Sequence, residues 1–237
     1  MDLVDFLERG DAEYLPHLSV DIVIIGYRKG RLKCLLLRIG NKWLLPGGYI
    51  GRKESVDDAA IRILGERTGL GNPHLKFLDV FGNKDRQFSD EWKAYFTESN
   101  IPWKESYWIT ERFVTLTYYS LVDIEQVNLR KGLMDDEIAW FDYNELPEIW
   151  LDHRSIILSA RERLKGDLRQ EQITYNLLPE KFTMPQLHEL HQVILQEKLD
   201  RSRFQKKMLA TGMLERLPEL PKERPGRNPF QYRVKNV

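Results

Sequence analysis

The stretch GGYIGRKESVDDAAIRILGERTGLG, residues 47–71, constrains the fold of this chain more than any other part of the sequence. Ser55 with Asp58 resembles the capping box that starts many helices, and Gly69 suits the position just beyond a helix end. The spacing therefore predicts a helix over residues 56–68, held between two glycine-containing loops.

Strand-like and helical stretches alternate on both sides of this helix. The apolar runs at 20–27 and 32–38, joined by the short turn at Lys29-Gly30, predict a β-hairpin. Further strands are predicted at 74–82, 112–123 and 137–143. The aromatic and polar residues 83–111 predict an extended loop.

The composition places the chain among folded globular proteins. Of its 237 residues, 42% are hydrophobic and 30% are charged, which is untypical of a disordered chain. The single cysteine, Cys34, lies in the apolar run LKCLLLR, so the sequence offers no disulfide framework. No stretch approaches the ~20 apolar residues that a membrane-spanning helix needs. The acidic start MDLVDFLERGDAEYL lacks a secretory signal pattern, so we expect a cytoplasmic protein.

A formal net charge of zero hides an asymmetry along the chain. Residues 181–237 carry 12 Lys and Arg against 6 Asp and Glu, whereas the residues before them carry 24 against 30. The C-terminal region is thus cationic and the rest is anionic. This division indicates that the C-terminal region meets an anionic partner.

The C-terminal part has the layout of a winged helix-turn-helix. Residues 152–168, 183–196 and 200–212 have helical spacing, and a basic stretch with Pro and Gly at its tip follows them. In the last helix, Phe204, Met208 and Leu209 are expected to form the buried face. The predicted DNA-binding residues lie on the other faces and in the hairpin: Arg201, Arg203, Gln205, Lys206, Lys207, Arg224, Arg227 and Asn228.

The opening stretch also resembles a known motif, the Nudix box. The residues that carry the resemblance are Gly48, Glu54, Arg62, Leu64, Glu66, Gly69 and Leu70, in the spacing G-x5-E-x7-R-x-U-x-E-x-x-G-U with U apolar. In active members of that family the helix holds a divalent cation that bridges a pyrophosphate. The resemblance further implies that Glu54 and Arg62 pair to brace the loop against the helix.

The metal-binding part of the motif is degenerate. Carboxylates at helix positions i, i+3 and i+4 share one face, where their oxygens can ligate Mg²⁺. In this chain those positions hold Ile63, Glu66 and Arg67. His188 and His191 are spaced i, i+3 on a later helix, but no third ligand accompanies them. We therefore predict no enzyme activity, no metal and no cofactor.

A wider resemblance covers nearly the whole chain. VDIVIIGY, the box, FGNKDR and the C-terminal helices resemble the Nudix-related bacterial transcriptional regulators of the NrtR type, with the arabinose-responsive AraR subgroup as the nearest. The resemblance implies an α+β fold with a Nudix-like α/β/α sandwich and mixed sheet over residues 1–152, containing the degenerate box at 48–70. A C-terminal winged helix-turn-helix would span 153–237. It also implies a homodimer that binds double-stranded operator DNA and a small effector, with L-arabinose favoured.

Effector-binding residues are expected beside the degenerate box. The predicted set is Asp21, Arg38, Trp43, Tyr49, Lys53, Glu54 and Glu66. Asp21 opens an apolar strand, where an unpaired carboxylate is costly to bury, so it either hydrogen-bonds a polyol or caps a neighbouring loop. Two alternative functions stay open: a sensor of an NAD metabolite such as ADP-ribose, and an active Nudix pyrophosphohydrolase.

Overall fold

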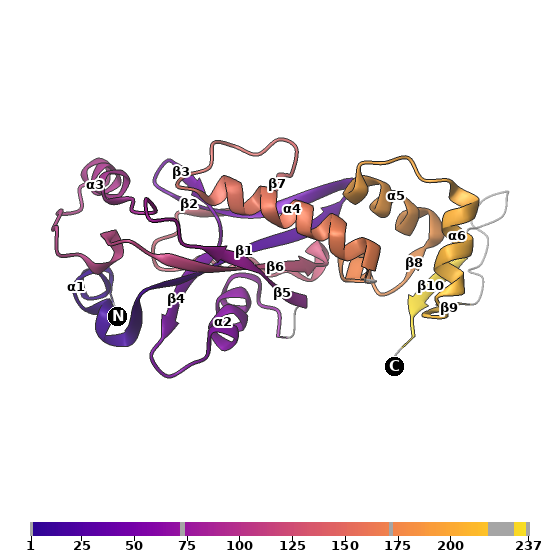
Figure 1. The fold of residues 1–237 in the computed structure, drawn as a ribbon, viewed down its shortest axis with the longest axis horizontal. Helices are drawn as coiled ribbons and strands as arrows, with labels where there is room; N and C mark the ends of the chain where they lie inside the picture. The colour runs from indigo at the N-terminus through magenta and orange to yellow at the C-terminus, as the bar shows by residue number, and fades with distance from the viewer. Residues whose placement is uncertain (1, 72–73, 171–172, 218–229, 236–237) are drawn as a thin grey trace.

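The computed structural model describes residues 2–71, 74–170, 173–217 and 230–235. Its N-terminal body is built on a seven-stranded mixed sheet, in which β1 and β6 are parallel and the other paired strands are antiparallel (Figure 1). The order is β3-β2-β1-β6-β5, with β4 also paired to β1 and β7 to β2. The strands are β1 (Tyr14–Arg28), β2 (Arg31–Ile39), β3 (Lys42–Leu44), β4 (Gly47–Gly51), β5 (His74–Phe81), β6 (Val114–Val122) and β7 (Glu137–Asp142).

The predicted hairpin is the β1–β2 pair. Lys29 and Gly30 have φ angles of 52° and 73°, so the chain reverses through the left-handed region in which glycine is unstrained. Arg28 then pairs directly with Arg31. The short turn fixes the register, and alternate residues of β1 enter two different apolar clusters, one on each face of the sheet.

The predicted helix over residues 56–68 is confirmed as α2 (Val56–Thr68). The Asp58 N–H donates to the Ser55 hydroxyl oxygen at 3.1 Å, and the Gly69 N–H donates to the Gly65 carbonyl at 2.8 Å. Gly69 has a φ angle of 70°, as a helix-ending glycine does. Helix α2 covers one face of the sheet and α4 (His153–Gln170) covers the other, which gives the predicted α/β/α sandwich (Figure 1).

The prediction of an extended loop over residues 83–111 is wrong. This region forms α3 (Ser89–Glu98) and the 3-10 helix η1 (Trp108–Thr110). Phe88 at the start of α3 makes no side-chain capping hydrogen bond, so the usual helix-start signal is absent from the sequence. Tertiary burial stabilises the helix instead, because Tyr95 and Phe96 pack in an aromatic cluster with Trp108.

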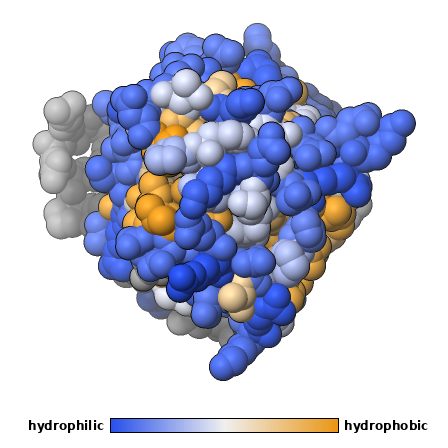
Figure 2. All heavy atoms as spheres, turned by 90° about the vertical axis from the view of Figure 1, so that its left-hand side faces the viewer, coloured by the Kyte–Doolittle hydropathy of each residue, from blue (hydrophilic) through white to orange (hydrophobic). Residues whose placement is uncertain are grey.

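The aromatic cluster joins α3 to the N-terminal helix α1 (Leu3–Glu13). Phe6 of α1 lies edge-on to Trp108 with ring centroids 5.6 Å apart, and the Trp108 indole N–H donates to the Phe6 carbonyl at 2.8 Å. Seen from the end that carries α1 and α3, the molecule is largely hydrophilic with small apolar patches (Figure 2). The aromatic side chains thus form an interior at this end rather than an exposed surface.

The C-terminal body is a winged helix. After η3 (Ile173–Leu177) come β8 (Phe182–Thr183), α5 (Met184–Leu195), α6 (Arg201–Ala210), β9 (Leu214–Arg216) and β10 (Gln231–Val234). The strands form an antiparallel sheet in the order β8-β10-β9. Helices α5 and α6 confirm the predictions at 183–196 and 200–212, and the tip of the predicted hairpin lies outside the described residues. No helix formed by the described residues is long and apolar enough to cross a membrane.

Helix α4 belongs to both bodies by its contacts. It packs on β1, β5 and β6 of the large sheet and also on α5 (Figure 1). The predicted boundary between residues 152 and 153 therefore falls at the start of a helix that covers the sheet, and it remains a prediction.

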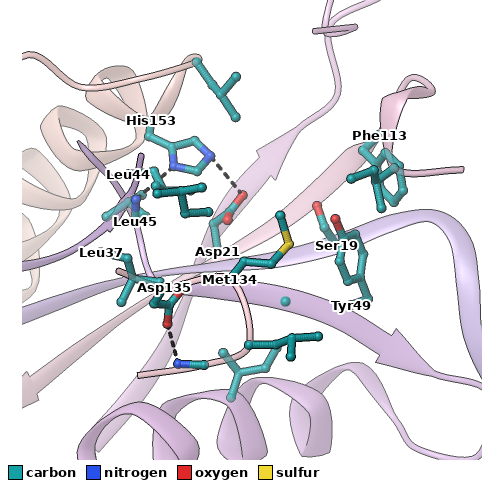
Figure 3. Close-up of a pocket in the computed structure, with 18 of the residues that line it drawn as sticks. Ser19, Asp21, Leu37, Leu44, Leu45, Tyr49, Phe113, Met134, Asp135 and His153 are labelled. Atoms are coloured by element: carbon teal, nitrogen blue, oxygen red, sulfur yellow. Dashed lines mark hydrogen bonds and ion pairs between the residues drawn. The ribbon is translucent and has the colours of Figure 1, made fainter. Parts of the chain in front are cut away.

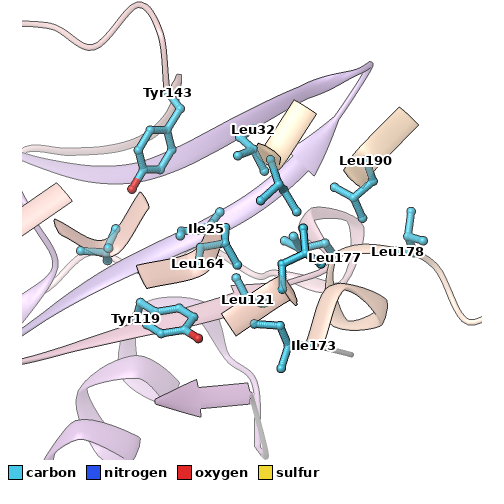
Figure 4. Packing of buried hydrophobic residues seen from close by; sticks show 14 of the residues in the cluster. Ile25, Leu32, Tyr119, Leu121, Tyr143, Leu164, Ile173, Leu177, Leu178 and Leu190 are labelled. Atoms are coloured by element: carbon cyan, nitrogen blue, oxygen red, sulfur yellow. The ribbon is translucent and has the colours of Figure 1, made fainter. Parts of the chain in front are cut away.

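The two bodies share one hydrophobic core. A single cluster of buried side chains continues from Ile25 and Leu121 of the large sheet, through Leu164 of α4 and Leu177, to Leu190 of α5 (Figure 4). Phe204 and Met208 of α6 belong to the same cluster. Burying this surface stabilises the fold, and the shared core ties the winged helix to the sheet.

Leu190→Ala is expected to lower the free energy of unfolding by about 2–5 kcal/mol, because Leu190 is fully buried and the substitution leaves a cavity. Leu209, which is 43% exposed, is the matched control, and its Ala variant should change stability by no more than about 0.5 kcal/mol. Urea denaturation followed by circular dichroism measures both. Because the core is continuous, the loss should shift one common transition; two separate transitions, with only the later part of the chain affected, would contradict the shared core.

Candidate functional site

A cavity of about 700 Å³ opens beside α2, between the large sheet and the aromatic end of the molecule. Its apolar walls include the aromatic residues Phe6, Tyr14, Tyr49, Phe88, Trp92 and Phe113. Its charged lining consists of Asp21, Arg62, Glu66, Arg67, Arg86, Glu111, Arg130, Lys131 and Asp135. In Figure 3, Asp21 and His153 point toward each other, while Tyr49 lies beside Phe113 on another side. Apolar walls with a few convergent polar groups are typical of a small-molecule site.

Asp21 is the buried anion of the cavity. Only 7% of its surface is exposed, and its Oδ2 accepts a hydrogen bond from the Thr115 hydroxyl at 2.8 Å. The same oxygen lies 3.6 Å from Nη2 of Arg86, whose guanidinium also donates to Asp152 through Nε at 2.8 Å. A buried carboxylate needs such partners, because without them its desolvation is strongly unfavourable.

His153, the first residue of α4, completes this polar group. The Leu45 N–H donates to its Nδ1 at 3.0 Å, and its Nε2 lies 3.8 Å from Asp21 Oδ2. Since Nδ1 accepts, the proton of the neutral ring resides on Nε2, which faces Asp21. Burial lowers the pKa of His153, and the nearby carboxylates of Asp21 and Asp152 oppose this effect only in part. The ring is therefore neutral at pH 7.

The brace predicted between Glu54 and Arg62 is confirmed. Arg62 donates through Nη2 to Glu54 Oε1 at 2.6 Å and through Nε to Glu54 Oε2 at 3.0 Å. The Gly51 N–H donates to the same carboxylate at 2.7 Å, and Arg62 also donates to the Tyr49 carbonyl at 3.0 Å. The hydrogen bonds from Arg62 are the main reason that the pKa of Glu54 is lowered. This bidentate pair ties the loop after β4 to α2 without any metal.

The three helix positions that would hold metal ligands lie in three different environments. Ile63 is 2% exposed and packs in the core under α2, close to Gly48. Glu66 is half exposed and pairs with Arg62 at 3.3 Å. Arg67 forms an ion pair with Asp135, which belongs to a different part of the chain. In the described ranges, no three His, Cys, Asp or Glu side chains are grouped closely enough to hold a metal ion.

Three of the seven predicted effector residues line the cavity: Asp21, Tyr49 and Glu66. The other four do not. Arg38 donates to Glu137, Trp43 packs edge-on against Phe141, Lys53 is exposed on the turn before α2, and Glu54 is held in the brace.

Several other lining residues had only weak signals in the sequence. Arg86 ends the stretch FGNKDR, which formed part of the family resemblance, but its role beside Asp21 had no local signature. His153, Phe113 and Asp135 come from distant parts of the chain and meet only through the sheet topology. Their contribution to the cavity could not be read from local spacing.

The exposed face of α6 carries all five predicted DNA-binding residues that this helix contains: Arg201, Arg203, Gln205, Lys206 and Lys207. Phe204 and Met208 are buried as expected, whereas Leu209 is 43% exposed. The expectation for Leu209 is wrong. An α-helix has 3.6 residues per turn, so a residue five positions after Phe204 points away from the buried face on which Phe204 lies. Arg224, Arg227 and Asn228 lie outside the described residues.

Comparison with known proteins yields two matches to protein-family models. A NUDIX domain model matches residues 15–160, and an NrtR DNA-binding winged helix domain model matches residues 174–234. The chain is 24% identical over 209 residues to the ADPR responsive transcriptional repressor NtrR of Acinetobacter baylyi, covering 84% of this chain and 75% of that protein. It is 25% identical over 150 residues to the ADP-ribose pyrophosphatase of Methanocaldococcus jannaschii, covering 61% of this chain and 75% of that protein. The structure of Shewanella oneidensis NrtR complexed with a 27mer DNA is similar with a TM-score of 0.68 and 25% identity, covering 92% of this chain and 93% of that chain.

A buried histidine that packs against α6 is expected to make the stability of the fold depend on pH. His191 of α5 packs edge-on against Phe204 with ring centroids 4.9 Å apart, and its Nε2 lies 3.0 Å from the Thr174 hydroxyl. Burial, with a smaller effect of Lys207, lowers the pKa of His191 to about 4. In the unfolded chain the pKa is about 6.5, so between these values the unfolded state binds more protons and stability falls as pH falls.

The free energy of unfolding should therefore decrease by up to roughly 1.4 kcal/mol per pH unit from His191 alone as pH falls from about 6.5 toward 4. Urea denaturation of the parent and of His191→Gln across this range isolates the contribution. The variant should show a flatter dependence, whatever constant offset the loss of the ring causes. Parallel curves for the two proteins would contradict the prediction.

Proposed function

This chain belongs to the Nudix family, and from that premise we propose that it is a DNA-binding transcriptional regulator of the NrtR type whose Nudix domain senses a small molecule. The observation that carries the proposal is that one shared core joins two parts. One part has a cavity beside the helix of the Nudix box, and the other is a winged helix with a cationic exposed face. The similarity to a NrtR structure bound to DNA supports the same assignment. Effector binding in the cavity would change operator binding by the winged helix.

The chemistry of α2 supports a sensing role rather than hydrolysis. Metal-assisted hydrolysis needs several oxygen ligands around one cation and a positioned water. In this chain Ile63 is turned into the core and Arg67 places a permanent cation where an anionic ligand would be needed. Glu66 is left without a second carboxylate on the helix face of the motif.

For the effector, we propose ADP-ribose or a related nucleoside diphosphate sugar as the first candidate. The A. baylyi relative is named as responsive to ADPR, which supports the ADP-ribose alternative over arabinose. The cavity volume of about 700 Å³ suits a ligand of that size. Exposed Arg130 and Lys131 at its edge offer charge for a diphosphate, and Tyr49 with Trp92 and Phe113 offers apolar surface for a base.

L-arabinose remains the second candidate because of one feature of the lining. Arg62, Arg67 and Arg86 are each already paired with a carboxylate, so the inner part of the cavity has few free cations among the described residues. Asp21 beside aromatic walls suits the hydroxyl groups and apolar face of an uncharged sugar. The relatives named above include no arabinose-responsive protein, so the case for arabinose rests on this chemistry and on the family resemblance.

DNA recognition is assigned to α6. Its N-cap Asp200 accepts from the Arg203 N–H at 2.7 Å, and the helix then presents Arg203, Gln205 and Lys206 outward while Phe204 anchors it. A helix with this division can enter the major groove and contact base edges and phosphates. We propose a homodimer, whose two copies of α6 would read a palindromic operator.

Effector identity is tested by thermal unfolding with ADP-ribose and, separately, with L-arabinose. A ligand that binds only the folded state stabilises it by about 2.7 kcal/mol at a concentration 100 times its Kd, so the true effector should raise Tm in a dose-dependent way. We expect ADP-ribose to do so and to change operator affinity at the same concentrations. A shift with arabinose alone would select the second candidate, and no shift with either would remove both.

The same samples test the absence of hydrolysis. With Mg²⁺ or Mn²⁺ present, ADP-ribose should be recovered intact by chromatography, at the level seen with Glu66→Ala. Metal-dependent release of AMP that disappears in Glu66→Ala would instead establish the pyrophosphohydrolase alternative.

DNA binding is tested by fluorescence anisotropy over a salt series with operator and scrambled duplexes. Lys206→Ala is expected to weaken both duplexes alike and to reduce the salt slope by about one, as loss of a phosphate contact does. Arg203→Ala should cost roughly 1–3 kcal/mol on the operator and relax preference at one base position. Arg9→Ala, an exposed arginine on α1, is the matched control and should behave as the parent. If Arg203→Ala and Lys206→Ala both bind DNA as the parent does, α6 is not the DNA reader.

A further inference from the structure

One wall of the cavity is an irregular segment, residues 130–135, that lies between η2 (Ile124–Gln126) and β7. Two backbone hydrogen bonds fix the start of the segment and the residues before it to the end of α2: Asn128 N–H to the Thr68 carbonyl at 2.9 Å, and Arg130 N–H to the Arg67 carbonyl at 3.0 Å. On the far side, the Asp136 N–H donates to the Arg38 carbonyl at 2.8 Å. Between these anchors the 130–135 segment belongs to no helix or strand.

A buried ion pair holds the middle of this segment. Arg67 of α2 pairs through Nη1 with Asp135, and the two side chains are only 14% and 3% exposed. The same Asp135 oxygen accepts from the Gly132 N–H at 2.6 Å, which closes the bend. The guanidinium lies so close to Gly132 that a Cβ atom at this position would overlap it. Arg67 therefore fills the concave side of the bend.

We propose that Arg67 is a positioning residue of the effector site, which it shapes by holding the 130–135 segment against the cavity through Asp135. This inference rests on the proposed sensing function. Removing one partner of a buried pair leaves the other charge unpaired in a poorly solvated place, so the segment must rearrange to expose it. The 130–135 segment has no regular secondary structure to resist that rearrangement.

The consequence for binding is a loss of preorganisation. If the wall is in place in only about a tenth of the molecules, the measured affinity falls about tenfold even though the contacts in the bound state are unchanged. Because the wall is organised by protein side chains, effector binding by the parent should also be insensitive to EDTA and to added Mg²⁺.

The experiment compares Arg67→Met, Asp135→Asn, their double variant and Gly132→Ala. The last variant keeps both charges but forces the guanidinium out of the bend. Arg28→Met is the matched control, since it breaks the exposed Arg28–Glu125 ion pair, 3.0 Å long, neither residue of which lines the cavity. Two readouts are taken on the full chain: amide hydrogen exchange of peptides covering residues 128–136, and calorimetric affinity for ADP-ribose and for L-arabinose.

The expected result is faster exchange of the 128–136 peptides in Arg67→Met, Asp135→Asn and Gly132→Ala, about tenfold weaker binding of the effector, and no change of either in Arg28→Met. The double variant should be no worse than the more damaging single variant, because both remove one interaction. Unchanged exchange in the pair variants overturns the inference, and so does faster exchange with unchanged affinity. If the parent binds neither ligand, the proposed effectors fail, while the exchange readout still decides whether Arg67 holds the wall.

Discussion

Strand β1 is buried on both faces between Val20 and Ile25 and hydrogen-bonds to β2, β4 and β6, so it is held along both edges in the middle of the large sheet. Its middle carries Asp21 into the cavity. Its end reaches the winged helix, where Tyr27 lies beside Glu189 of α5. The pKa of Tyr27 is raised, mainly by burial and to a smaller extent by the Glu189 carboxylate. The cavity and the winged helix are therefore positioned by one continuous strand, and the hydrophobic cluster on the α4 side of the sheet continues into the winged helix.

The degenerate helix α2 separates the scaffold of the motif from its chemistry. The bidentate Glu54–Arg62 pair needs only two side chains and a backbone N–H, and it persists. Two of the positions that would carry metal ligands have other roles in this chain. Ile63 packs in the core, and Arg67 forms an ion pair with Asp135 of another segment. A fold of this kind can thus keep its geometry while its site changes, because the interactions that specify each are different.

The sequence predicted those elements whose determining residues lie within or next to them, and it failed where distant residues determine the structure. Helix α2 was predicted to the residue because its capping residues Ser55 and Gly69 directly flank it, whereas α3 follows Phe88, which makes no capping hydrogen bond, and is stabilised by tertiary burial. The effector residues show the same limit on strands. Leu37 and Ile39 line the cavity but Arg38 between them does not, and Leu44 lines it while its neighbour Trp43 does not. Side chains alternate across a strand, so knowing that a strand passes the site does not tell which of its faces meets the ligand.

The start of α4 connects the cavity to the winged helix through direct contacts. Asp152 and His153 engage Arg86 and Asp21 at the floor of the cavity, and the helix that follows packs on α5. A ligand changes DNA affinity only by as much as its own affinity differs between two arrangements of the protein, and the operator must change ligand affinity by the same factor. Close-packed interiors favour a few discrete arrangements over gradual deformation. Under the proposed function, a ligand that contacts Asp21 or Arg86 would act on groups that lie against Asp152 and His153, and differential contacts there would bias α4, which packs on both the sheet and α5.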